Sequence, residues 1–422
     1  MMSSQYPKLR TLDLRPYTRD GKPFVLVRDP LSLSNKTLLI PQPLASTLAF
    51  CDGTMDARAI SAALAVRVGY WVSPGEIDGL LAALDEALLL DNERSFEIQK
   101  KALETYRQAP FRPPCCADQV YPGDAEALSQ FLQGFIERVD GKGAPVAGDF
   151  TPLGGRGLIS PHIDYDRGGL VYAQVWRRAA SMMQDADLVV ILGTDHNGSK
   201  DIFTLTRQNY ATPFGMLPTA QDVVDALATA IGEEDVFAGE LRHQSEHSVE
   251  LAAVWLQFMR AECNLNRMQS ASPASFEIVP LLAGSLAPLA DDAVQLEENA
   301  MLNRFMQALG KATAGKRVVI VAAGDLSHVG PAFGGQPVDF ISRARIKAAD
   351  EELITKICTG DAPGFYEAVR QVDDRNNVCG LSPIYLTMRL LNPVRGERVA
   401  YDLCPADEQG TSLVTICGIV LQ

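Results

Sequence analysis

Continuous apolar runs alternate with amphipathic segments over most of the chain. Runs in which nearly every residue is apolar predict buried strands over 157–160, 188–193, 276–283, 317–323 and 411–420. Apolar positions at helical spacing predict helices near 170–185, 219–231, 246–261, 293–314, 340–358 and 381–391. This alternation is typical of an α/β domain, in which helices cover both faces of a mostly parallel sheet.

The N-terminal quarter follows a different pattern. Two short β-like runs, 24–27 and 37–40, precede two amphipathic helices and a charged helix over about 94–108. The second helix has a clear start, with Ser73 as N-cap, Pro74 at the first helical position and Glu76 three residues after the cap. Three prolines in 109–116 then interrupt the pattern. We therefore predict a mainly helical domain over 1–108, a linker over 109–118 and the α/β domain over 119–422.

Composition excludes several classes of partner. The formal net charge is −14, from 52 acidic and 38 basic residues, which disfavours binding to nucleic acid or to an anionic membrane. No apolar run approaches the ~20 residues of a spanning helix, and the first residues lack the apolar stretch of a signal peptide. The 8 cysteines show no CxxC or zinc-type spacing, so we expect a reduced, cytoplasmic protein.

Four of the 5 histidines follow a predicted strand or open a predicted helix. His162, His196 and His328 each come just after a strand, and His247 begins the helix through Trp255. Because the carboxyl ends of parallel strands meet at one edge of a sheet, this placement indicates a shared metal or acid/base site. The alternative for each histidine alone is a hydrogen-bonded loop residue. His243, four residues before His247, is expected on the surface outside the site.

Two further motifs add chemistry to this edge. Asp325 stands three residues before His328, where it could orient an imidazole or act as a base; a capping aspartate is the alternative. Cys379 lies in a Gly/Asn-rich turn before a helix, a position that favours a thiolate and so a third metal ligand.

The order of these motifs resembles the Memo-like family, which includes protein B of the AmmeMemoRadiSam system. The motifs are PHxxY followed by GG, ILGxxH, EHSxE, DxxH after a strand, and CGxxP, and the resemblance covers about 119–422. It implies the fold of the LigB-type class III extradiol dioxygenases and a metal site of two histidines and a cysteine. Carried onto this sequence, the metal ligands are His162, His196 and Cys379, and the catalytic positions are His247, Asp325 and His328. The remaining pocket positions are Asp164, Tyr165, Asp195, Asn197, Glu246 and Glu250.

These patterns lead us to expect a protein with redox or dioxygenase-like chemistry at one divalent transition metal, on a small-molecule or peptide substrate. Iron(II) is the first expectation, copper the second, and zinc stays open. The first ~100 residues resemble a PqqD-like winged-helix domain, which implies peptide binding; a generic helical domain is the alternative. Two other functions stay open: a peptide-binding scaffold that works with a radical-SAM protein, and a zinc hydrolase with Asp325 or Glu250 as base.

Overall fold

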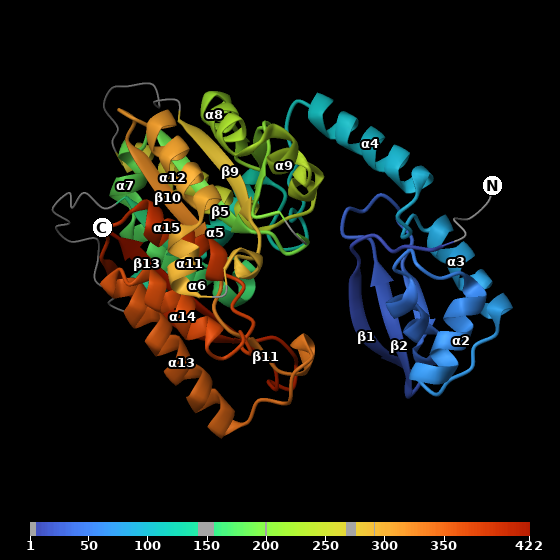
Figure 1. Ribbon diagram of the computed structural model, residues 1–422. Helices are drawn as coiled ribbons and strands as arrows, with labels where there is room; N and C mark the ends of the chain where they lie inside the picture. The colour runs from blue at the N-terminus through green and yellow to red at the C-terminus, as the bar shows by residue number, and fades with distance from the viewer. Residues whose placement is uncertain (1–5, 142–155, 199–200, 267–275, 291) are drawn as a thin grey trace. The chain divides into compact units, whose positions relative to one another are not determined.

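The chain divides into two compact units, Met1–Ala109 and Pro110–Gln422. The computed structural model, drawn in Figure 1, describes residues 6–141, 156–198, 201–266, 276–290 and 292–422. Among the helices in these ranges, none is both long enough and apolar enough to cross a bilayer.

The first unit combines a small antiparallel sheet with helices. The strands are β1 (Asp13–Arg19), β2 (Lys22–Arg28) and β3 (Leu38–Pro41), in that order, and the helices are α1 (Gln42–Ala45), α2 (Ala57–Arg67), α3 (Pro74–Glu86) and α4 (Glu93–Gln108). The sequence pattern missed β1 because this edge strand is polar, almost wholly exposed and contains Pro16.

The predicted start of α3 is confirmed. The Ser73 hydroxyl accepts a hydrogen bond from the Glu76 N–H, and the Glu76 carboxylate accepts one from the Ser73 N–H, which completes a capping box with Pro74 at the first helical position. The apolar face of the helix is buried in the core of the first unit, at Ile77, Leu80, Leu81 and Leu84.

An eight-stranded sheet forms the centre of the second unit. Its order is β11-β13-β4-β10-β5-β9-β6, with β12 paired to β13. The strands are β4 (Gly157–Ser160), β5 (Leu188–Thr194), β6 (Phe203–Leu205), β9 (Glu277–Ala283), β10 (Val318–Ala323), β11 (His328–Val329), β12 (Gly396–Pro405) and β13 (Leu413–Leu421). The four central strands β4, β10, β5 and β9 run parallel, and antiparallel strands extend the sheet at both edges. Short β7 (Tyr210–Thr212) and β8 (Gly215–Leu217) form a separate hairpin.

Helices cover both faces of this sheet, as Figure 1 shows. Along β5, Leu188, Val190 and Leu192 pack in one core, while Val189 and Ile191 pack in the other, as expected for a central strand buried on both sides. The first core includes α8 (Gln221–Ile231), α11 (Ala293–Glu298), α12 (Ala300–Ala312), α13 (Phe340–Thr359), α14 (Ala362–Arg370) and α15 (Leu381–Leu390). The second includes α5 (Ala125–Asp140), α6 (Tyr165–Arg178), α7 (Ala180–Asp185) and α10 (Ser248–Asn266). The predicted α/β fold class is therefore confirmed.

The segment that we expected to be a linker packs into the second unit from Pro110 onward. Arg112 pairs with the β7 region, because its N–H donates to the Asn209 carbonyl and its carbonyl accepts from the Ala211 N–H. Its side chain is fully buried. The three prolines thus end the regular structure, but the segment still packs against the second unit. The buried guanidinium of Arg112 holds it there through hydrogen bonds to buried acceptors.

Candidate metal centre

Three parallel strands end at the same level of the sheet. Ala323 at the end of β10 lies opposite Ser160 of β4 and opposite Gly193 of β5. His162 and Asp325 each come two residues after their strand's level position, and His196 comes three residues after. The register of the sheet therefore brings these side chains to one edge, as the sequence predicts.

His162 is held so that one ring nitrogen, Nε2, keeps an unprotonated lone pair. Its side chain is buried, its main-chain N–H donates to Asp325 Oδ1 at 2.9 Å, and its Nδ1 lies 3.0 Å from the Ala323 carbonyl oxygen. Because a carbonyl can only accept, Nδ1 must carry the proton, and Nε2 keeps its lone pair. Pro161 ends the strand and directs the chain into this position.

Glu246 contacts the Nδ1 atoms of two further histidines. Its carboxylate oxygens lie 3.0 and 3.1 Å from His196 Nδ1 and 3.2 Å from His247 Nδ1. Oε1 also accepts the Ser248 N–H at 2.9 Å, which explains why α10 begins at Ser248, two residues later than the sequence pattern suggests. Both imidazoles thereby direct Nε2 away from the carboxylate, toward the cluster.

Cys379 enters the same cluster from the turn before α15. Its Sγ lies 3.1 Å from His162 Nε2, and the Thr194 hydroxyl donates to the Cys379 carbonyl at 3.1 Å. The turn is tight because the Gly380 N–H donates to the Asp325 carbonyl, and a Cβ on Gly380 would lie 2.5 Å from that oxygen. Only glycine permits this approach, so Gly380 helps to place the thiol.

Two overlapping groups of side chains could hold a metal ion. The ligand atoms of His162, His196 and His247 lie within 4.8 Å of one another, and so do those of His162, Asp325 and Cys379. The rings of His162 and His196 have centroids 4.9 Å apart, and the His196 and His247 rings stack at 4.9 Å. Imidazole nitrogen and thiol sulfur fit zinc, copper or iron better than magnesium or calcium. The residues present therefore fit a transition metal.

Burial and neighbouring charges shift the pKa values of these groups in different directions. Burial lowers the pKa of His162 well below its usual value, which keeps this imidazole neutral. Burial also acts to lower the pKa of His196, but the Glu246 carboxylate outweighs it and raises the pKa well above the usual value. Burial raises the pKa of Asp325 and of the Cys379 thiol. A divalent cation placed among these groups would favour their ligating forms.

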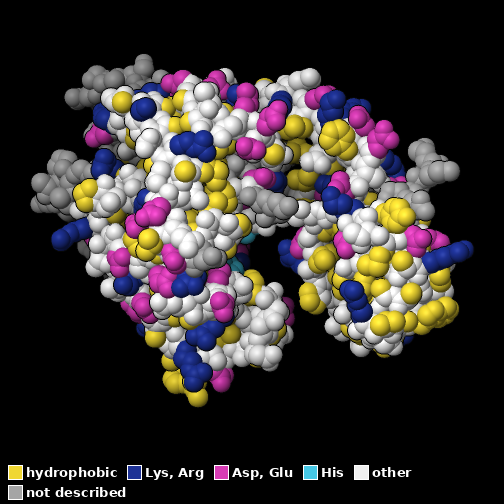
Figure 2. Space-filling model, in the orientation of Figure 1, with side chains coloured by type: hydrophobic (Ala, Val, Ile, Leu, Met, Phe, Trp, Pro, Cys, Tyr) yellow, Lys and Arg dark blue, Asp and Glu magenta, His cyan; other side chains and the backbone are white. Residues whose placement is uncertain are grey.

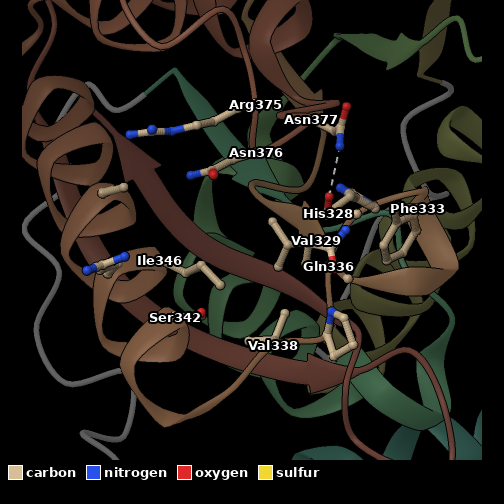
Figure 3. Close-up of a pocket in the computed structure, with 15 residues that line it drawn as sticks. His328, Val329, Phe333, Gln336, Val338, Ser342, Ile346, Arg375, Asn376 and Asn377 are labelled. Carbon is tan, nitrogen blue, oxygen red and sulfur yellow. Dashed lines mark hydrogen bonds between the residues drawn. The ribbon is translucent and has the colours of Figure 1, made fainter.

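His328 stands beside this cluster and is in neither ligand group. Its Nδ1 lies 3.3 Å from the Leu326 carbonyl oxygen, and its ring contacts Phe333 edge-on at 5.1 Å. Figure 3 shows the ring at the wall of a cavity of about 620 Å³. Burial lowers the pKa of His328, and the nearby Asp325 carboxylate acts against this shift, so His328 is an electrostatic neighbour of the cluster.

Glu250 belongs to a second buried cluster. Its carboxylate is ion-paired with Arg112 and accepts hydrogen bonds from the Tyr121 hydroxyl and from the N–H groups of Cys115 and Cys116. Arg112 also donates to the carbonyls of His243 and Glu246, at 2.8 Å each. The carboxylate is fully used in this way, so Glu250 is a support for the start of α10. The sequence pattern does not indicate this role, because Arg112 lies among prolines that suggest a linker.

The other predicted pocket residues have separate contacts. Asp164 caps α6 and pairs with Arg167, while the buried Tyr165 hydroxyl donates to the Leu251 carbonyl. Asp195 pairs with Arg242 at 2.8 Å. Asn197 is half-buried directly after His196.

The expectation for His243 is wrong, because this residue is fully buried. Its Nε2 lies 3.0 Å from the Thr204 carbonyl oxygen, and its Nδ1 bonds the Tyr210 hydroxyl. One acceptor and one donor satisfy a neutral ring, which allows burial without a charge. Figure 2 shows little histidine on this face of the molecule, and the fully buried His243 contributes nothing to the surface.

Fold and site together define an α/β protein with a histidine- and cysteine-containing site at the carboxyl edge of a parallel sheet. The model of the Memo-like protein family matches residues 112–414, and the chain belongs to this family. A MEMO1 family protein of Aquifex aeolicus is 27% identical over 420 residues, covering 98% of this chain and 99% of its own. A MEMO1 family protein of Methanosarcina mazei is 27% identical over 288 residues, covering 68% of this chain and 88% of its own. One from Archaeoglobus fulgidus is 24% identical over 313 residues, covering 74% and 99%. The similarity to the Aquifex protein thus includes the first unit.

Proposed function

We propose that this chain is a metalloprotein in which His162, His196 and Cys379 hold one divalent transition metal. The observation that carries the proposal is the approach of Cys379 Sγ to within 3.1 Å of His162 Nε2, beside the His196 ring. Two such atoms can share one ion at ligand distances of roughly 2.0–2.3 Å. Membership of the Memo-like family supports the same ligand set through the motif order.

We further propose redox chemistry, with iron(II) as the first metal and copper as the second. A bound iron(II) with three protein ligands supplies open positions and electrons for oxygen-dependent or related redox chemistry. The chain itself supplies orientation and proton transfer. Glu246 fixes the tautomers of His196 and His247, Asp325 holds His162, and His247 Nε2 accepts or donates a proton at the cluster.

The test is the metal content of full-length protein purified without oxygen. We expect about one iron or copper per chain, lost in His162→Ala and in Cys379→Ser. One zinc per chain would replace the redox proposal by hydrolysis. A wild-type protein that is folded and binds none of these metals would leave the peptide-binding alternative.

A zinc hydrolase is the second candidate, and one observation favours it. The ligand atoms of His162, His196 and His247 lie mutually within 4.8 Å, and three histidines are a common ligand set for catalytic zinc. Asp325 is then the base, since its carboxylate lies 3.6 Å from His162 Nε2. Glu250 is a poor base, because Arg112 and three other donors occupy it.

The first unit supports a role in binding a peptide or a partner such as a radical-SAM protein. Large apolar side chains are exposed in the last turn of α2 and just after it, with Val66, Tyr70 and Trp71 at 86%, 56% and 71% exposure. Exposed apolar side chains close in sequence are typical of interaction surfaces. Trp71→Ser should weaken peptide binding and leave metal content unchanged; equal peptide binding by the variant would remove this role.

A cytoplasmic location is part of the same proposal. The thiols of Cys51, Cys358 and Cys379 are free, as expected for a protein in a reducing compartment.

A further inference from the structure

A cavity of about 620 Å³ opens beside the candidate metal centre. The chain segment after β10, the first half of α13 and the turn before Cys379 form its walls. Figure 3 shows Arg375 and Asn376 on one side, His328 and Phe333 on the other, with Val329 between them and Ile346 below Arg375 and Asn376. Its volume is in the range typical of small-molecule sites, roughly 300–1,000 Å³.

The charge of the cavity contrasts with that of the chain. The net charge is −14, yet the 15 lining residues include Arg345 and Arg375 and neither Asp nor Glu. Within the described ranges, no carboxylate forms an ion pair with either guanidinium. Two carboxylates close in sequence bond main-chain groups: Asp339 accepts the Ser342 N–H, and Asp374 accepts the Val378 N–H. The guanidinium groups are therefore available to an anion.

The rest of the lining suits an apolar body. Val338 and Ile346 are buried at the cavity wall, and Phe333 stands edge-on to His328. A ligand with an aromatic or aliphatic part would cover these side chains. Its anionic end would then reach the arginines.

The cavity and the metal centre share their walls. The His328 N–H donates to the Asn376 carbonyl at 2.6 Å, and the Asn377 side chain donates to the His328 carbonyl at 3.1 Å. This turn runs directly into Cys379, whose thiol contacts His162. A molecule bound between Arg375 and His328 therefore lies against the same turn that supplies Cys379.

We infer that this cavity binds a small organic anion, a carboxylate or phosphate ester with an apolar body, and holds it for reaction beside His328. The reaction rests on the proposed metal centre, whereas the binding does not.

The binding test uses fluorescence titration of the full chain with anilinonaphthalene sulfonate, an apolar probe with one negative charge. Arg345→Gln and Arg375→Gln should each weaken binding about tenfold, the usual size of one charge-assisted contact. Lys347→Gln is the matched control, because Lys347 is exposed on the same helix, outside the lining. Wild-type affinity in both arginine variants, or equal binding of uncharged phenylnaphthylamine, would overturn the inference.

Displacement by benzoate and by phenyl phosphate then identifies the anion, since stronger displacement assigns the group. His162→Ala separates the two proposals: probe binding should persist while metal is lost. Fluorobenzoate should show faster fluorine relaxation with cobalt(II)-loaded than with zinc-loaded protein if the ligand lies beside the centre. Equal relaxation would overturn the positioning beside the metal, and a wild-type protein without metal would defeat the proposed function while leaving arginine-dependent binding intact.

Discussion

Nδ1 of His196 lies 3.0 Å from the carboxylate of Glu246, which also approaches His247. One buried carboxylate thus orients two imidazoles, and its own pKa lies well below its usual value: burial acts to raise it, but the charges of His196 and His247 outweigh burial. Such supporting partners set both the tautomer and the direction of a metal-binding ring.

Glu246→Ala should therefore lower metal affinity by about 10–100-fold, measured by competition with a chelator. The metal affinity of Glu246→Gln should lie between those of Glu246→Ala and the wild type, because an amide oxygen can accept from only one ring at a time. Gln244→Ala, an exposed change two residues away, is the control. Unchanged affinity in Glu246→Ala would show that this carboxylate is not a support of the site.

Cys379→Ser should weaken metal binding by more than the ~10–100-fold that is typical of a supporting residue. The reason is that a hydroxyl is a much poorer ligand than a thiolate for a soft or borderline metal. The thiolate charge-transfer absorption of cobalt(II)-loaded protein should disappear as well. Cys358→Ser, a half-buried free thiol in α13, is the control. Persistence of the absorption band in Cys379→Ser would exclude this sulfur from the ligand set.

The parts of the site that lie at strand ends could be predicted from the sequence, because a continuous apolar run marks a central strand and its end marks the sheet edge. His162, His196 and Asp325 are of this kind. The supports could not be predicted in the same way. Glu246 is one acidic residue at a helix start, and only the folded chain shows that its carboxylate reaches two rings.

The burial of Arg112 and His243 could not be predicted from the sequence either. Prolines around Arg112 suggest a linker, and a lone histidine before a helix suggests the surface. Both side chains are fully buried, because each finds partners more than 30 residues away in the sequence: Glu250 for Arg112, and Tyr210 with Thr204 for His243. Periodicity reports local structure and cannot reveal such distant pairs.

Arg112→Met should lower the free energy of unfolding by about 3–5 kcal/mol, because it leaves the Glu250 carboxylate buried without its cation. Adding Glu250→Gln should restore part of the loss. Arg317→Met, which breaks an exposed pair with Asp187, should cost only about 0–1 kcal/mol. Urea unfolding measures all three.

The same ion pair decides where the second unit can begin. A chain that begins at Pro110 should fold, while one that begins at Tyr121 lacks Arg112 and should be strongly destabilised. Equal stability of the two truncated chains would contradict a role for Arg112.

The free energy of unfolding should fall in acid, partly because His243 takes up a proton more readily in the unfolded chain. Burial lowers the pKa of His243 to about 3, below the ~6.5 of an unfolded chain, so the unfolded state binds the proton more readily. The contribution is complete above about pH 6.5 and is lost by ~1.4 kcal/mol per unit as the pH falls toward 3. His243→Gln should lower stability at neutral pH and flatten the pH dependence between pH 6 and 4 by about this slope. Parallel curves for the variant and the wild type would contradict the neutral, buried imidazole.

The His247→Ala variant distinguishes the proposed ligand set of His162, His196 and Cys379 from the three-histidine group. Its ligand atom lies within 4.8 Å of those of His162 and His196, yet its Nδ1 is only 3.2 Å from the same carboxylate that orients His196. If the metal is held by His162, His196 and Cys379, His247→Ala should keep about one metal per chain and lower turnover by roughly 10²–10⁴-fold, the usual range for loss of a proton-transfer group. Chelator competition gives the affinity, and His247→Gln tests whether a neutral hydrogen-bonding group restores activity. If the alanine variant loses the metal as His162→Ala does, His247 is a ligand and the three-histidine set, with the zinc hydrolase it favours, replaces the thiolate-containing one.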